Sequence, residues 1–282
     1  MNEEASELTS YKRIVRIAAI FLTIPAASAM AAPALQMHRA VYDLSLGRTE
    51  PVSNITGIDG RMVVEWRGGP SCGGYTSLQR VVTHMTATGA TGSSSDIRLS
   101  YWEAADGSEF RFTRTEYANG ELTGREEGTA TRERDGKVLV SRDGETPFEM
   151  EEDVLFPVEY NLALIEEAEA GHRIFSRPIF DGTEEGENPT TAFIGKPVSV
   201  QDDLAGMKVE GGGAALAGAR AWPVRIGYFD VKDSEDGEGM ATFEMGHLLF
   251  PNGVAAKLTL DYTDLELKGK LSELTYFAPG DC

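Results

Sequence analysis

Residues 97–113 read IRLSYWEAADGSEFRFT, and this stretch decides the fold class. Apolar residues alternate with polar ones on both sides of the Asp106-Gly107 pair. The apolar positions are Ile97, Leu99 and Tyr101 before the pair and Phe110 and Phe112 after it. A period of two is typical of a strand with one buried face, and Asp-Gly favours the left-handed backbone of a tight hairpin turn. The stretch therefore predicts an antiparallel hairpin.

The same type of turn-forming pair recurs along the chain. Asp-Gly pairs begin at Asp59, Asp106, Asp135, Asp143, Asp181 and Asp236, and Asn-Gly pairs at Asn119 and Asn252. Alternating runs flank several of these pairs, as in Met62, Val64 and Trp66. No fixed repeat occurs, which argues against a propeller. We therefore expect an all-β fold made mostly of antiparallel strands.

Two segments depart from this alternation. Residues 157–170 place Val158, Leu162 and Ile165 on one helical face, begin at Pro157 and are followed by Gly171, so they predict one short helix. Residues 205–218 contain a three-glycine run and no periodicity, which is typical of a mobile loop. Such a loop either gates a ligand or is a tolerated insertion.

The N-terminus has the features of a signal peptide. Basic residues up to Arg16 precede the apolar run 17–24, which is too short to span a bilayer. Ala27 and Ala29 form a small-x-small pattern, so cleavage after Ala29 is predicted. The alternative is a membrane anchor, but no stop-transfer run follows. We expect a signal peptide at 1–29 and one exported domain at 30–282 that does not span a membrane.

The net charge of -19 limits the class of partner. An acidic surface repels phosphates, so nucleic acid and bare anionic membrane are poor partners. Basic proteins and cations are compatible with this charge. A charge of this sign also has the simpler role of keeping a protein soluble.

The chain has two cysteines, Cys72 and Cys282. In an exported protein an even count favours a disulfide, and a cysteine at the last residue fits this interpretation. The alternative is two free thiols. The bond would tie the final strand back to the beginning and keep a curved sheet from opening.

Catalytic and metal-binding patterns are weak in this sequence. Residues 69–73 match the Gly-x-Ser-x-Gly pattern around Ser71, but that motif needs a helix after the serine, and residues 75–85 alternate like a strand. A hydrolase using Ser71 is therefore a second hypothesis. The histidines are widely spaced and lack metal-ligand spacing, so no metal or cofactor is predicted. They are His38, His84, His172 and His247.

Large aromatic residues supply the remaining candidate site. They are Trp66, Tyr101, Phe112, Trp222 and Phe243. Most residues of this kind form a core. In an incompletely closed barrel, however, the concave face can hold a lipid chain or an extended segment of a partner. We treat these five as candidate cavity-lining residues.

Several segments carry a family resemblance. They are HRAVYDLSL at 38–46, GRMV at 60–63, CGGYT at 72–76, LFP at 155–157, FDG at 180–182, NGV at 252–254, LDY at 260–262 and the final Cys282. Together they resemble the EipB family of cell-envelope integrity proteins over nearly all of the predicted mature chain. The resemblance implies a periplasmic protein of Gram-negative bacteria with a role in stress resistance. It also implies a β-spiral around a short helix, distantly like periplasmic lipoprotein carriers.

The resemblance further implies a structural disulfide between Cys72 and Cys282 and no catalytic residues. The leading hypothesis is a non-enzymatic, monomeric periplasmic protein that maintains envelope integrity. It would bind a lipid, a lipoprotein or a protein partner in a half-open β-barrel. The alternatives are an envelope hydrolase using Ser71 and an acidic scaffold for basic partners.

Overall fold

The computed structural model describes residues 35–51, 53–151, 153–182, 186, 188–200, 208–230, 239–278 and 280–282. The signal peptide predicted for residues 1–29 lies outside this part of the chain. Within the described ranges, no helix is both long and apolar enough to cross a membrane.

Strands dominate the described chain, with one α-helix and two short 3-10 helices. The elements are β1 (His38–Thr49), β2 (Ile55–Gly69), η1 (Pro70–Cys72), β3 (Gly74–Ala87), β4 (Ser93–Ala104), β5 (Glu109–Ala118), β6 (Glu121–Arg132), β7 (Val138–Arg142), β8 (Phe148–Met150), α1 (Pro157–Ala170), β9 (Ile174–Ser176), β10 (Thr190–Ile194), β11 (Val198–Ser199), β12 (Glu210–Gly211), η2 (Gly212–Leu216), β13 (Arg220–Tyr228), β14 (Phe243–Leu249), β15 (Ala255–Asp261) and β16 (Leu265–Tyr276).

The strands form one open, mostly antiparallel sheet. Its order is β8-β7-β6-β5-β4-β3-β2-β1-β16-β15-β14-β13-β10-β9, and short β12 adds a parallel pair to β16. Nearly every strand lies beside its neighbour in the sequence, and the first and last strands pair near the middle of this order. The ends, β8 and β9, are not paired with each other, so the sheet is not closed into a barrel. The predicted fold class is confirmed.

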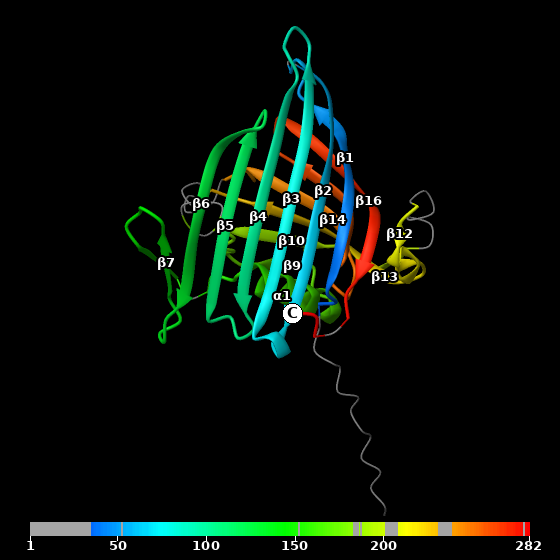
Figure 1. The fold of residues 1–282 in the computed structure, drawn as a ribbon. Helices are drawn as coiled ribbons and strands as arrows, with labels where there is room; N and C mark the ends of the chain where they lie inside the picture. Colours follow the sequence, from blue (N-terminus) through cyan, green and yellow to red (C-terminus); the bar gives the residue numbers. More distant parts are fainter. Residues whose placement is uncertain are drawn as a thin grey trace, which may run out of the picture. The chain divides into compact units, whose positions relative to one another are not determined.

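The stretch at residues 97–113 forms the predicted hairpin. Strands β4 and β5 pair from Ser95 opposite Ala118 to Glu103 opposite Phe110, with Asp106 in the turn. Figure 1 shows these long strands in the wall formed by β1 to β6, with β13 and β14 passing behind it. The prediction was possible because a hairpin depends only on local residues.

Helix α1 covers the residues for which the sequence predicts a helix, and it connects the two end strands β8 and β9. Its buried face contains Tyr160, Leu164 and Ile165, whereas Leu162 is half-buried. These side chains pack on Trp222 and Val224 of β13, and Trp222 is only 1% exposed. The helix therefore covers the inner face of the second half of the sheet.

An aromatic cluster fills the inner face of the first half. Phe110 is fully buried at its centre, and its ring lies 5.3–6.1 Å from the rings of four other aromatic residues. They are Tyr101, Phe112, Phe156 and Phe180. Phe156 directly precedes α1, so this cluster also fixes the start of the helix.

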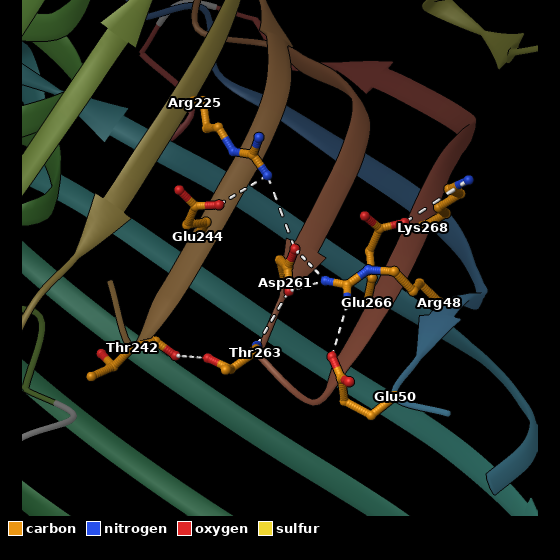
Figure 2. Close-up of polar contacts among 9 residues, drawn as sticks. All are labelled: Arg48, Glu50, Arg225, Thr242, Glu244, Asp261, Thr263, Glu266 and Lys268. Atoms are coloured by element: carbon orange, nitrogen blue, oxygen red, sulfur yellow. Dashed lines mark hydrogen bonds and ion pairs between the residues drawn. The ribbon is translucent and has the colours of Figure 1, made fainter. Parts of the chain in front are cut away.

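A network of ion pairs joins β1, β13, β14 and β15 (Figure 2). Arg48 of β1 donates two hydrogen bonds of 3.0 Å to Asp261 of β15, and Arg225 of β13 pairs with Glu244 of β14 at 2.9 Å. Figure 2 shows Asp261 between the two arginines. This charged cluster is internally paired, so we assign it a structural role.

The segment 205–218, predicted to be a mobile loop, contains short regular structure in its described part, residues 208–218. Its mobility stays a prediction. Residues 205–207 lie outside the described ranges, but β12 pairs with β16 and η2 buries Leu216. A Cβ on Gly212 would lie 2.8 Å from the ring of Tyr276, and Gly211 has a φ of 74°. The glycines allow the backbone to approach β16 closely.

Candidate functional site

One row of residues crosses the inner face of the seven neighbouring strands β1 to β7. The residues lie opposite one another in the order His38, Trp66, Ser77, Tyr101, Phe112, Gly128 and Arg142. We call this set the inner row. Residues opposite each other in antiparallel strands point to the same face of a sheet. Because Tyr101 and Phe112 belong to the aromatic cluster, the whole row faces the interior.

The row is tightly packed around Phe112. Gly128, its partner on β6, has no side chain, and a Cβ there would lie 2.6 Å from Cζ of Phe112. Gly182 has a φ of 77°, and a Cβ there would lie 2.5 Å from Cγ of the same ring. Both glycines make room for this ring.

The structure places the five candidate lining residues on the inner face in separate groups. Trp66, Tyr101 and Phe112 share the inner row, and Trp66 is half-buried. Trp222 packs under α1, and the ring of Phe243 lies between those of Tyr228 and Tyr262, with ring centres 5.3 and 4.8 Å away. That these residues line a ligand site stays a prediction.

The interior is less tightly packed one row further along the strands. The next row runs through Val64, Gln79, Leu99, Arg114 and Glu126. The first four are half-buried and Glu126 is exposed, whereas Tyr101 and Phe112 are buried. The inner row therefore marks the boundary between a fully buried core and a partly exposed inner face, on which apolar Val64 and Leu99 lie beside polar Gln79 and Arg114.

Arg142 ends the inner row on β7, two residues after the buried Val140. Its guanidinium lies 5.7–6.0 Å from the ring centres of Phe112, Phe148 and Phe180. Its Nε and Nη2 atoms are buried, and neither has a hydrogen-bond partner among the residues that the structure describes. Arg142 is not among the site residues predicted from the sequence. The available signal was one arginine continuing the alternation of Val138 and Val140.

Glu103 positions α1 beside the inner row. Its carboxyl group accepts hydrogen bonds from the backbone N–H groups of Val158 at 2.7 Å and Glu159 at 3.0 Å. These N–H groups have no partner within the helix, so the carboxyl caps its N-terminus. Burial raises the pKa of Glu103 to about 8, although the two backbone donors lower it. Glu159 in turn binds Arg132 at 2.8 Å.

The raised pKa of Glu103 gives a pH-dependent contribution to stability. The folded state favours the protonated form, so this contribution is complete below the unfolded pKa near 4.5 and is lost as the pH rises through about 8. Relative to Glu103→Gln, which does not titrate, the wild-type unfolding free energy should fall over this window. The fall is roughly 1.4 kcal/mol per unit of pKa difference. Urea unfolding of both proteins at pH 5, 6.5 and 8 measures it, and a constant difference would contradict the assignment.

The opposite face of the same strands carries shallow hollows. One of about 290 Å³ is lined in part by Val63, Leu78, Arg80 and Arg98. Both arginines donate hydrogen bonds to Asp96, which hold the pKa of its carboxyl well below the usual range. These two guanidinium groups therefore already bind a carboxylate.

Ser71 lies in η1, a single 3-10 turn between strands β2 and β3, and is exposed. The strand-turn-helix setting of a nucleophile elbow is not present at this position. His247 is buried on β14, where burial lowers its pKa to about 4, and His38 is buried beside Tyr276. No group of three or more possible metal ligands occurs among the described residues.

Cys72 and Cys282 are bonded to each other. Cys72 ends η1, and Cys282 lies six residues beyond the end of β16. Because β16 pairs with β1 and β1 with β2, the bond joins elements near the middle of the strand order. It therefore does not bridge the open edges β8 and β9, contrary to the expectation that it keeps the sheet from opening.

Comparisons with known proteins agree with this geometry. The family described as EipB-like matches residues 29–278. The cell envelope integrity protein EipB of Brucella abortus (strain 2308) is 36% identical over 259 residues, covering 90% of this chain and 89% of that protein. A crystal structure from Brucella abortus, described as a beta-barrel-like protein of a domain of unknown function, matches with a TM-score of 0.79. It is 33% identical and covers 88% of this chain and 100% of its own.

The family match covers nearly the whole described chain, and the Brucella protein is 36% identical over most of its length. The chain belongs to the EipB-like family.

Proposed function

We propose that this protein maintains the integrity of the cell envelope from the periplasm, without catalysis. It does so by binding a lipid, or a lipid-bearing or protein partner, on the inner face of its half-open sheet. The envelope role rests on the similarity to the Brucella protein of that name. The signal peptide expected at residues 1–29 supports the periplasmic location.

The observation that carries the binding proposal is the boundary at the inner row. In the row after Tyr101 and Phe112, half-buried apolar Val64 and Leu99 lie beside half-buried polar Gln79 and Arg114. Ligand sites commonly combine an apolar wall with a few polar groups, and they favour the mouths of β-barrels. Since β8 and β9 are not paired with each other, the strands do not form a closed barrel around the inner face.

Native mass spectrometry of the protein purified from its own envelope tests this proposal. We expect a population whose added mass is released by organic extraction and identified as lipid. Protein refolded from denaturant serves as the lipid-free control and should regain the added mass when mixed with envelope lipid extract. A consistently unloaded protein in both preparations would contradict lipid binding.

The acidic scaffold and the Ser71 hydrolase remain the alternatives. Many surface arginines are already paired with carboxylates, as Arg80 is with Asp96, so the exposed charge is mainly negative. A scaffold predicts partner binding that weakens strongly with salt, because exposed charges are screened. Binding on the inner face predicts only a weak salt dependence.

A further inference from the structure

We infer that Arg142 is the anion-recognition residue of the inner face, binding the carboxylate or phosphate head of an amphiphile. This inference rests on the proposed function and deepens it by naming the ligand chemistry. Two donors of this guanidinium are buried and have no hydrogen-bond partner within the described ranges. Buried polar groups are nearly always paired, so an unpaired pair of donors needs an explanation.

The identity of the two donors indicates the ligand. Nε and Nη2 lie on the same edge of the guanidinium, and their N–H bonds point in parallel. This edge matches the two oxygens of a carboxylate or phosphate. A single neutral acceptor would satisfy only one of them.

The same sheet contains two arginines that use this edge of the guanidinium to bind a carboxylate. On the outer face, Nε and Nη2 of Arg80 donate to the two oxygens of Asp96 at 2.9 and 2.8 Å. Arg98 uses the same two atoms on that carboxylate at 3.3 and 2.8 Å. Arg142 presents the same pair of donors, Nε and Nη2, toward the interior, and no described carboxylate binds them. We call this pair of donors the fork.

The surroundings of Arg142 favour an apolar tail next to the anionic head. The rings of Phe112, Phe148 and Phe180 surround the guanidinium. Phe148 and Leu99 are both partly buried and pack against the aromatic cluster, so they add apolar surface near the guanidinium. Arg142 is the last residue of β7, and only the three-residue β8 lies between β7 and the open edge of the sheet. An amphiphile can therefore approach from this edge. The ligand class is a fatty acid or a phospholipid-like phosphate.

Binding of two anionic probes and one neutral probe tests this assignment. Palmitoleate carries the carboxylate, a lysophosphatidic acid carries the phosphate, and palmitoleyl alcohol carries neither. For the wild-type protein we expect both anionic probes to bind at least about tenfold more tightly than the alcohol, because a charge-assisted fork is lost with the alcohol. Preference for one anionic probe identifies the head group.

Substitutions at Arg142 distinguish the contribution of the paired donors from that of the positive charge. Arg142→Lys keeps the charge but not the fork, and we expect about tenfold weaker binding of the anionic probes. Arg142→Met should bind all three probes alike, with the alcohol unaffected. Arg80→Lys is the matched control, since its fork is on the outer face, and it should bind like the wild type.

The outcomes distinguish this inference from the proposed function. If the wild type binds none of the three probes, both the lipid-binding proposal and the inference fail. If the wild type and the Arg142 variants bind all probes equally, only the inference fails. The melting temperature of Arg142→Met should not fall below that of the wild type, because its unpaired donors are removed. A large fall with unchanged binding would show a purely structural role and overturn the inference.

Discussion

Removing the Cys72–Cys282 disulfide should lower the free energy of unfolding by about 2–5 kcal/mol, or roughly 5–15 °C in melting temperature. The bond closes a loop with a sequence separation of 210 residues. Linking residues so far apart removes much conformational freedom from the unfolded chain, and the loop-entropy relation gives about 5 kcal/mol as an upper figure. Calorimetry of the wild type and of Cys72→Ser with Cys282→Ser measures the loss.

The double variant is also the control for reducing agent. Reduction should lower the wild-type melting temperature to that of the variant and leave the variant unchanged. Because the bond lies near the middle of the strand order, reduction below the melting temperature should not alter probe binding on the inner face. A wild-type melting temperature that is the same in oxidising and reducing buffer would contradict the stabilising role.

Replacing Phe110 by alanine should destabilise the protein by about 3–5 kcal/mol. The ring is fully buried and contacts four aromatic rings drawn from β4, β5 and the segments around α1. Its loss leaves a cavity where the sheet and the start of the helix meet, so the cost exceeds the simple loss of apolar area. Chemical denaturation monitored by circular dichroism gives the value.

Phe110→Leu and Leu139→Ala are matched comparisons. Leucine keeps most of the apolar volume, so its cost should be about 1–2 kcal/mol. Leu139 is 37% exposed on the outer face of β7, and its truncation should cost less than about 1 kcal/mol. Equal effects at Phe110 and Leu139 would show that the aromatic cluster is not the main core of this half.

The elements that depend on neighbouring residues could be predicted from the sequence. The β4–β5 hairpin follows from alternation around Asp106-Gly107, and α1 follows from Pro157, its apolar spacing and Gly171. The order of strands could not be derived this way. The pairing of β1 with β16 joins residues more than 200 positions apart, and no local pattern encodes it.

The candidate site shows the same limit. Alternation placed Trp66, Tyr101 and Phe112 on apolar faces, but only the strand register aligns them in one row that ends at Arg142. An arginine in an alternating strand usually indicates a solvent-facing position, so its burial depends on tertiary structure. The three-glycine run at 211–213 shows a related limit. Glycine is favoured both in flexible loops and where the backbone approaches another strand closely, so the sequence alone does not indicate the contact of this run with β16.

Photo-crosslinking from two adjacent positions on β3 tests the central claim most directly. Gln79 lies on the half-buried inner face, and Leu78 is 45% exposed on the outer face beside the hollow lined by Arg80. A benzophenone amino acid is placed at each position in turn, and the protein is irradiated in intact cells. Binding on the inner face predicts lipid or partner adducts from position 79 and few from position 78. Adducts confined to position 78, or equal at both, would contradict it.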